Sequence, residues 1–509
     1  MEFPLIVRDF LDRAETVYGD RVAVVDEPDQ PAPPFGGGEI SYRRMAQLAR
    51  AQAAGLDALG VPVGGRVAVV SHNSARLLTS FFGVSGYGRI LVPVNFRLSV
   101  PEVQYIVQHS GAEVLMVDPE LKNLLDEVEC ERKFLLGESD DEVWGSTSEP
   151  QPWEGDEHAT ATINYTSGTT ARPKGVQLTH RNNWLNATVF GWQASVSDDD
   201  VYLHTLPMFH ANGWGMPFAV TGMGGRHIVL RKVDGAEILR RVRDQGVTLM
   251  CAAPAVVAAA LEAARDWDGP VPGRDRTRIV VAGAPPPTRT IERVREELGW
   301  EFIQIYGLTE TAPVLTMSRM RSEWEALSST EQARKLGRAG YPAVGVRLAI
   351  DDTGEVLAQS NHNLEAYWDN PEATSVALAG NWFHTGDGGH LEDGALVIAD
   401  RKKDVIISGG ENVSSIEVED VLMSHPAVRE VAVIGIPDEK WGELVTALVV
   451  AESEVSEDEL IAHARQSLAG YKVPKKVEFR DELARTATGK LQKFKLRQPY
   501  WAGSEKQVN

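Results

Sequence analysis

Short apolar runs that alternate with amphipathic stretches constrain the fold of this chain more than any other feature. Runs at Arg66–Val70, Ile90–Val94 and Glu113–Val117 predict strands, and the stretches at 74–88 and 100–110 between them have helical periodicity. The rhythm resumes with strands predicted at 247–251, 278–282 and 301–305 and helices at 254–265 and 288–298. Strands and helices in this order form a mostly parallel sheet with helices on its faces. The length of 509 residues predicts at least two domains.

The sequence changes character after residue 354. Three short strands are predicted there, at 355–358, 382–384 and 395–398. The charged stretch Asp400–Asp404 follows, and we predict a large domain over residues 1–400 and a compact α+β domain over 401–509. A charged linker can act as a hinge, although composition alone favours a plain solvated turn. The polar, acidic stretch 130–158 is expected to be a surface excursion.

The composition argues against several partners and locations. A formal net charge of −21 argues against nucleic acid or an acidic membrane surface as the main partner. Cys130 and Cys251 provide neither a metal-binding spacing nor a disulfide framework, which favours a reducing cytoplasm. No signal peptide is evident, and the longest apolar stretch, 251–261, is shorter than the roughly 20 residues that cross a bilayer. We therefore expect a cytoplasmic protein without an integral membrane segment.

A loop at Tyr165–Gly175 combines small residues, hydroxyl groups and cations. Gly168 and Gly175 permit unusual backbone conformations and a close approach of backbone N–H groups to phosphate oxygens, while Arg172 and Lys174 add positive charge. Four hydroxyl donors lie in the same loop: Thr166, Ser167, Thr169 and Thr170. The loop departs from the common phosphate-binding pattern, and such runs are more often solvated turns. The ordered pattern T-S-G-T-T-x-x-P-K-G is more specific and predicts a polyphosphate cradle.

Further candidate residues follow predicted strands and turns downstream. Tyr306 could lie against a base, and Glu310 could hold magnesium beside a triphosphate, because hard cations prefer carboxylate oxygens. Asp387 could accept hydrogen bonds from ribose hydroxyls. The Gly-rich turn 408–412 could accept a narrow substrate arm, and Lys490 on a Thr/Gly-rich loop could stabilise developing negative charge. Each of these features, taken singly, is more often a plain turn or a solvated tip.

Together these stretches form an ordered series, and the chain resembles the adenylate-forming, AMP-binding superfamily. The resemblance covers nearly the whole chain and rests on eight stretches: Tyr165–Gly175, Leu206–His210, Ala282–Pro285, Tyr306–Glu310, Thr385–Asp387, Asp400–Asp404, Ser408–Asn412 and Thr488–Lys490. Two further stretches, 435–442 and 470–475, look like the acyl-CoA synthetase branch, which includes the fatty-acid–CoA ligases.

The resemblance implies both a fold and a reaction. The fold is α/β, with a large N-terminal domain of mixed, mostly parallel sheets flanked by helices, a β-barrel-like subdomain, and a small mobile α+β C-terminal domain. The reaction joins a carboxylic acid to ATP, giving an acyl-adenylate and pyrophosphate, and then transfers the acyl group to coenzyme A. Mg²⁺ assists, a medium- or long-chain fatty acid or an aryl acid is the substrate, and a homodimer is one assembly that the resemblance allows.

The resemblance also implies which residues bind the nucleotide. Lys174 and the loop hydroxyls hold the β- and γ-phosphates, and Glu310 binds magnesium. Asp387 and Arg401 hold the ribose hydroxyls. The whole implied set is Thr166, Ser167, Gly168, Thr169, Thr170, Lys174, Gly283, Ala284, Tyr306, Gly307, Thr309, Asp387, Arg401 and Lys490.

Other roles are implied for catalysis, for domain motion and for the acyl group. Lys490 bridges the carboxylate and the α-phosphate, and Lys403 matches the hinge about which the small domain rotates. After rotation, three residues line the pantetheine tunnel: Ser408, Gly409 and Gly410. His210 lies in the motif that lines the acyl pocket, with a core histidine as the competing interpretation. An apolar acyl slot is suggested for Trp184, Trp192, Phe209, Trp214 and Met216, although such residues more often form core.

Some positions depart from the usual pattern of the superfamily. Ala171 and Ala366 stand where glycines are common, and Ser414–Ser415 replaces a frequent Tyr-Pro pair. None of these changes removes a catalytic group, so they leave the acid and the acceptor open rather than the adenylation. One alternative is an adenylating enzyme with another acceptor or anion, such as a carrier protein, an amine or nitrite for diazotisation. The other is a non-catalytic nucleotide-binding sensor.

Overall fold

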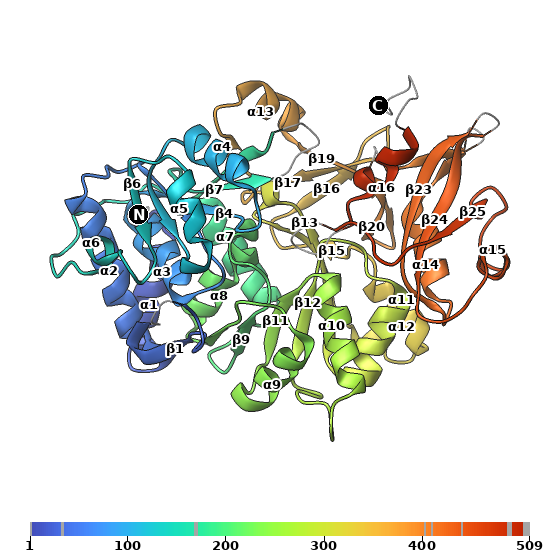
Figure 1. The fold of residues 1–509 in the computed structure, drawn as a ribbon, viewed down its shortest axis with the longest axis horizontal. Helices are drawn as coiled ribbons and strands as arrows, with labels where there is room; N and C mark the ends of the chain where they lie inside the picture. The colour runs from blue at the N-terminus through green and yellow to red at the C-terminus, as the bar shows by residue number, and fades with distance from the viewer. Residues whose placement is uncertain are drawn as a thin grey trace.

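The structure of the protein is a computed structural model. It describes residues 3–31, 35–166, 172–401, 404–408, 411–438, 441–485 and 491–501. Figure 1 shows a large N-terminal part, coloured from blue to gold, with a smaller C-terminal part in orange and red beside it. The predicted nucleotide-binding residues Lys174, Tyr306 and Asp387 lie on strands of three different sheets of the large part.

The first large sheet has seven strands in the order β18-β8-β7-β4-β3-β5-β6. They are β3 (Arg66–Val70), β4 (Ile90–Val94), β5 (Ala112–Val117), β6 (Arg132–Leu135), β7 (Thr160–Thr166), β8 (Lys174–Thr179) and β18 (Ala366–Tyr367). The run from β7 to β6 is parallel, whereas β8 and β18 join antiparallel. Val67 and Val69 face one core cluster and Ala68 and Val70 another, because helices cover both faces of this parallel sheet.

The second large sheet has nine strands in the order β15-β14-β13-β12-β11-β9-β10-β1-β2. They are β1 (Val22–Val25), β2 (Glu39–Ser41), β9 (Val201–His204), β10 (Arg226–Val229), β11 (Leu249–Ala252), β12 (Arg278–Val281), β13 (Glu301–Gly307), β14 (Val314–Ser318) and β15 (Tyr341–Pro342). Neighbouring strands pair in parallel along the spatial order β13-β12-β11-β9-β10-β1. At the two edges of the sheet, β14 and β15 on one side and β2 on the other pair antiparallel with their neighbours.

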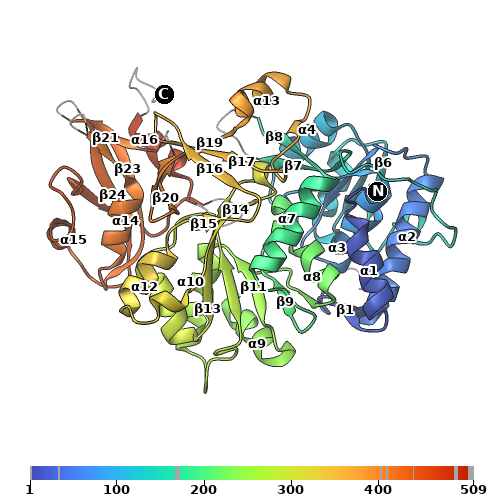
Figure 2. The ribbon, with the colours of Figure 1, turned by 180° about the vertical axis from the view of Figure 1, so that it is seen from behind.

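Helices fill the space between the two sheets and cover their outer faces. The helices that share one core cluster with both sheets are α1 (Arg8–Tyr18), α2 (Tyr42–Ala58), α3 (Ala75–Gly83), α6 (Asp141–Trp144), α7 (His180–Gln193) and α8 (Met216–Met223). Figure 2 shows α8 between α1 and α7 in the view from behind. The remaining α-helices of the large part are α4 (Val100–Ser110), α5 (Lys122–Glu127), α9 (Gly235–Gln245), α10 (Pro254–Arg265), α11 (Thr288–Arg293), α12 (Ser329–Leu336) and α13 (Pro371–Ala377).

Capping residues fix where helices begin after strands. At the start of α7, the Thr179 hydroxyl accepts from Asn182 N at 3.1 Å, and Asn182 Oδ1 accepts from Thr179 N at 2.8 Å. Ser328 and Glu331 make the same reciprocal pair at α12. Such a capping box satisfies two backbone donors at a helix start, so α7 begins directly where β8 ends.

Two smaller sheets follow the large ones, the first antiparallel and the second mixed. The four-stranded sheet has the order β16-β17-β19-β20, with β16 (Arg347–Ile350), β17 (Glu355–Gln359), β19 (Phe383–Glu392) and β20 (Ala395–Arg401). The C-terminal sheet contains β21 (Ile406–Ser408), β22 (Glu411–Val413), β23 (Val428–Asp438), β24 (Gly442–Ala451) and β25 (Lys476–Phe479). Its helices are α14 (Ser415–Met423), α15 (Glu457–Arg465) and α16 (Lys493–Trp501).

Polar contacts join the C-terminal part to the start of α11. Thr288 donates to the Asp420 carboxylate from its backbone N at 2.8 Å and from its hydroxyl at 3.1 Å. Arg289 donates to the backbone oxygen of His425 at 3.1 Å. These hydrogen bonds dock α14 against the edge of the large part.

The structure confirms the predicted α/β class and its mixed, mostly parallel sheets. The strands predicted at 66–70 and 90–94 and the helices at 100–110 and 254–265 have those bounds. The expectation that 130–158 is a surface excursion is wrong in part, because β6 pairs with β5 and Val143 and Trp144 are buried. Among the described residues, no helix has the length and apolarity needed to cross a bilayer. The division of the chain at residue 400 stays a prediction.

Candidate functional site

The predicted phosphate loop connects two paired strands. β7 and β8 form an antiparallel pair in which Tyr165 lies opposite Gly175 and Thr166 opposite Lys174. The hydroxyl of Tyr165 lies 2.8 Å from His109 Nδ1, which anchors the start of the loop to α4. Ser167, Gly168, Thr169 and Thr170 lie outside the described residues, so their predicted role stays a prediction.

A chain of side chains connects Lys174 with Glu310. The Lys174 ammonium lies 4.9 Å from the centre of the Tyr367 ring, and the Tyr367 hydroxyl donates to Glu310 Oε1 at 2.9 Å. Burial and the nearby Glu310 carboxylate raise the pKa of Tyr367, which keeps its hydroxyl protonated and able to donate. β8, β18 and the short helix η6 (Thr309–Thr311) supply the three residues. Two of the predicted site residues thus meet through a third that was not predicted.

A second pair joins Tyr306, within β13, to Asp387, in β19. The Tyr306 hydroxyl donates to Asp387 Oδ2 at 2.8 Å, and Asp387 is only 6 % exposed. Asp387 lies opposite Arg401 in the ladder of β19 and β20, which puts the two residues predicted for the ribose side by side. The side chain of Arg401 is outside what the structure describes.

Small residues keep the backbone close at the ends of β12 and β13. A side chain at Gly307 would collide with the backbone carbonyl of Pro313, so only glycine fits there. Gly283, two residues after β12, has a φ of 101°, a conformation that favours glycine. Ala284 follows Gly283, and Thr309 begins η6. Since β12 and β13 are parallel neighbours, these residues lie at the carboxyl ends of adjacent strands, where α/β sheets bind ligands.

The turn after His210 has an unusual backbone. Ala211, Asn212, Gly213, Trp214 and Gly215 all have left-handed dihedrals, with φ between 38° and 79°. Each residue other than glycine costs roughly 1–2 kcal/mol in this conformation, so the turn persists only because surrounding contacts hold it. His210 is half-buried at the start of this segment, η4 (His210–Gly215).

Buried amide side chains hold this turn. Asn212 Nδ2 donates to Thr162 Oγ1 at 2.9 Å and to Asn183 Oδ1 at 2.8 Å. Its Oδ1 accepts from Asn164 Nδ2 at 3.0 Å. Asn73 similarly fixes the segment before the turn: it donates to the carbonyl oxygens of three residues, His204, Leu206 and Leu230, and accepts from Met208 N. The sequence analysis missed both amides, which carry no motif of their own.

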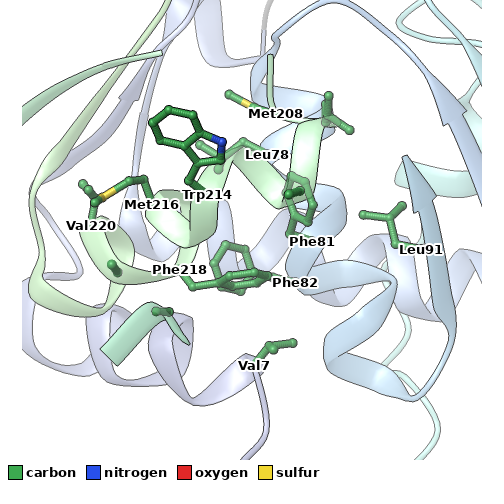
Figure 3. Close-up of a cluster of buried hydrophobic side chains, with 14 of the residues drawn as sticks. Val7, Leu78, Phe81, Phe82, Leu91, Met208, Trp214, Met216, Phe218 and Val220 are labelled. Carbon is green, nitrogen blue, oxygen red and sulfur yellow. The ribbon is translucent and has the colours of Figure 1, made fainter. Parts of the chain in front are cut away.

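The suggested acyl slot divides into buried and exposed residues. Trp214 is 4 % exposed and belongs to the core cluster that contains Met216 and Phe218, as Figure 3 shows. Trp192 is 70 % exposed, so including it in an interior slot was wrong. The buried residues of α7 recur at 183, 186–187 and 190–191, and Trp192 falls outside this spacing, on the exposed side of the helix. Trp184 packs against Phe10 of α1, with ring centroids 5.7 Å apart.

The residues predicted for the mobile domain are only partly described. Ser408 ends β21, is 3 % exposed and pairs with Glu411 across the hairpin. The other four, Lys403, Gly409, Gly410 and Lys490, lie outside the described residues. Their assignments as hinge, tunnel and catalytic residues therefore stay predictions.

The donor set fits a magnesium ion that arrives with a polyphosphate. Among the described residues, no group of three or more His, Cys, Asp and Glu side chains could hold a metal ion. Mg²⁺ usually binds through one or two carboxylates together with substrate phosphates and waters. Glu310 supplies one such carboxylate, and its Oε1 is oriented by Tyr367. The chemistry of the site therefore agrees with the metal role predicted for Glu310.

Comparisons with known proteins agree over both parts of the chain. The AMP-binding enzyme family matches residues 11–368, and the AMP-binding enzyme C-terminal domain matches 417–490. The chain is 36 % identical to 4-hydroxybutyrate–CoA ligase 2 of Metallosphaera sedula, over 98 % of this chain and 95 % of that one. It is 35 % identical to 2-methylpropanoate–CoA ligase CCL4 of Humulus lupulus, over 97 % and 95 %.

Solved structures show the same relationship. The anthranilate CoA ligase AuaEII in complex with anthranoyl-AMP has a TM-score of 0.87 and 27 % identity, over 98 % of this chain and 99 % of that one. The o-succinylbenzoate CoA synthetase MenE of Bacillus subtilis, in complex with its acyl-adenylate intermediate, has a TM-score of 0.82 and 27 % identity, over 98 % and 99 %. The protein therefore belongs to the AMP-binding, adenylate-forming enzymes and is a ligase of the acyl-CoA synthetase type.

Proposed function

We propose that the protein activates a carboxylic acid with ATP and transfers the acyl group to coenzyme A. The observation that carries this proposal is the pairing of Lys174 with Glu310 through Tyr367, beside the pair of Tyr306 and Asp387. One pair offers a cation and a carboxylate for a metal-bound polyphosphate, and the other offers a buried carboxylate for a sugar. This combination suits a nucleoside triphosphate.

The reaction consists of two displacements. In the first, a carboxylate oxygen bonds to the α-phosphorus while the bond to the β-phosphate breaks, which releases pyrophosphate. In the second, the sulfur of coenzyme A bonds to the carbonyl carbon, the thiol loses its proton, and the bond from that carbon to the AMP oxygen breaks. The first step brings two anions together, so positioning and positive charge dominate its catalysis.

Each predicted residue then has a defined task. Lys174 neutralises phosphate charge, Asp387 and Arg401 hold the ribose, and Glu310 would hold magnesium, which supplies further positive charge to the phosphates. Lys490 on the C-terminal domain stabilises the α-phosphate during the first displacement. Rotation of residues 401–509 about Lys403 then replaces Lys490 with the pantetheine arm.

For the acid, we propose a substrate with an apolar body, either a medium or long fatty chain or an aryl ring. The buried aromatic and methionine side chains around Trp214 support an apolar acyl partner. Two relatives are named for the shorter acids 4-hydroxybutyrate and 2-methylpropanoate. A value of kcat/KM for four-carbon acids above that for every longer or aryl acid would overturn this choice.

The test is a pyrophosphate-exchange screen over acids of varied length and ring content, with and without coenzyme A. We expect acid-dependent exchange and a thioester product. Exchange without a thioester, but with product formed on a carrier protein or an amine, would replace coenzyme A as the acceptor. Exchange that depends on nitrite, with no carboxylic acid present, would instead replace the activated anion. Nucleotide binding without exchange for any acid would instead indicate a sensor, against which the presence of Lys174, Glu310, Asp387 and Lys490 argues.

A further inference from the structure

We propose that Asn212 is a positioning residue for the acyl group: its buried amide holds the left-handed turn 211–215 against β7 and so places His210 and Trp214. This inference rests on the proposed ligase function. It assigns a task to the buried polar cluster of Asn212, Thr162, Asn164 and Asn183.

The first observation is the cost of the turn. Five consecutive residues adopt left-handed dihedrals, and three of them, Ala211, Asn212 and Trp214, carry side chains that disfavour this conformation. Strained backbone of this kind persists where the surroundings determine it and clusters at functional sites. The turn lies directly after His210 and contains Trp214, the two residues that the sequence places beside the acyl group.

The second observation is that the amide of Asn212 is fully engaged. Both of its hydrogens have acceptors, Thr162 Oγ1 at 2.9 Å and Asn183 Oδ1 at 2.8 Å, and its oxygen accepts from Asn164 Nδ2 at 3.0 Å. Asn212 itself is 1 % exposed, and its three partners are at most 2 % exposed. A buried network whose members are all paired makes one arrangement rigid and unique.

The third observation is where the partners come from. Thr162 and Asn164 are two residues apart in β7 and so point to the same side of the strand, while Asn183 lies in the first turn of α7. Asn183 also donates to Thr179 O at 3.1 Å, at the end of β8. The network therefore fixes the turn to the two strands that flank the phosphate loop. The left-handed turn 211–215 is thus held by the same two strands, β7 and β8, that the phosphate loop connects.

A glycine substitution separates the side chain from the backbone. Asn is more tolerant of left-handed dihedrals than most residues, so a purely conformational role would be retained, or improved, in Asn212→Gly. A positioning role would be lost, because glycine cannot make the three hydrogen bonds. Asn212→Asp keeps the shape but removes both donated hydrogen bonds.

The experiment compares steady-state adenylation by the wild type, Asn212→Gly and Asn212→Asp with the best acid from the screen. We expect the KM for the acid to rise at least about tenfold in both variants, with the KM for ATP changed less than about threefold. Asn183→Ala removes one hydrogen-bond partner of Asn212 and leaves the sequence of the turn unchanged. This variant should raise the KM for the acid by a smaller factor than the Asn212 variants. This second position keeps the test decisive if an Asn212 variant does not fold.

Gln332→Ala is the matched control. Gln332 is a buried amide on α12 that donates to the backbone oxygens of Trp324 at 3.0 Å and Leu327 at 2.9 Å. Its loss should lower stability and leave both KM values unchanged. Asn212→Gly with a KM for the acid within twofold of wild type, or an equal rise in Gln332→Ala, would overturn the inference. A wild type that shows no acid-dependent exchange would refute the proposed function instead, which is a separate outcome.

Discussion

Replacing Tyr306 by Phe should weaken the binding of ATP without moving the ring. The Tyr306 hydroxyl donates to Asp387 Oδ2 at 2.8 Å, and Asp387 is 6 % exposed. In the proposed site the other positions of this carboxylate accept the ribose hydroxyls. Loss of the phenol therefore removes the group that orients the carboxylate, while the packing of the aromatic ring is retained.

The magnitude follows from the charge on the acceptor. A hydrogen bond to a charged group contributes about 1.5–3 kcal/mol, and 1.4 kcal/mol corresponds to about a factor of ten in binding. We therefore expect the KM for ATP to rise by about 10- to 100-fold in Tyr306→Phe. The KM for the acid should stay near that of the wild type, because Asp387 is not proposed to contact it.

Pyrophosphate exchange at varied ATP and 2′-deoxy-ATP measures this effect. The wild type should prefer ATP, and Tyr306→Phe should lose part of that preference. Tyr367→Phe is the matched control, since its hydroxyl also donates to a carboxylate, Glu310 Oε1, at 2.9 Å. That variant should raise the magnesium concentration needed for half-maximal rate and keep the preference for ATP. An unchanged KM for ATP and an unchanged preference in Tyr306→Phe would refute the reasoning.

Three further predictions concern stability and the domain movement. Arg231 and Asp118 form a two-pronged buried ion pair at 3.0 and 2.9 Å, so Arg231→Ala leaves a buried carboxylate unpaired. It should cost about 3–5 kcal/mol in urea unfolding, and an Arg231→Met, Asp118→Leu double variant that is no more stable than Arg231→Ala would contradict this. Burial lowers the pKa of His180 to about 3 and that of His362 to about 4. The unfolded chain therefore takes up protons before the folded chain as the pH falls. Each of these two histidines should lower the free energy of unfolding by about 1 kcal/mol between pH 6.5 and 5.5, and the His362→Gln variant should lose less stability over this range. Equal unfolding free energies at the two pH values would argue against this prediction. Lys403→Pro should slow thioester formation more than adenylation in single-turnover assays, and equal slowing would remove the hinge assignment.

Local patterns predicted the elements of the fold well. Val67 and Val69 on one face of β3, with Ala68 and Val70 on the other, make a short, Val-rich apolar run that favours a strand covered on both faces. The division of such strands between a seven-stranded and a nine-stranded sheet was not predictable, because it depends on contacts between distant segments. β6 was missed because Arg132 and Lys133 interrupt its short apolar signal.

The sequence predicted the site better where motifs are local than where contacts are distant. Lys174, Glu310, Tyr306 and Asp387 all lie in recognisable stretches, and the structure brings them together in two pairs. Tyr367 was missed because it becomes part of the site only when β18 pairs with β8. Asn212 was missed for a similar reason: its three partners lie 29 to 50 residues away in the chain.

Isotope tracing tests the central claim most directly. The protein is incubated with ATP, coenzyme A and an acid whose carboxylate carries ¹⁸O, and the products are analysed by mass spectrometry. Because the carboxylate oxygen attacks the α-phosphorus and stays with it when the thiol displaces AMP, one ¹⁸O should appear in AMP, with unlabelled pyrophosphate and an acyl-CoA thioester. Label in inorganic phosphate with ADP as the nucleotide product, or thioester formation with unlabelled AMP, would contradict an acyl-adenylate intermediate.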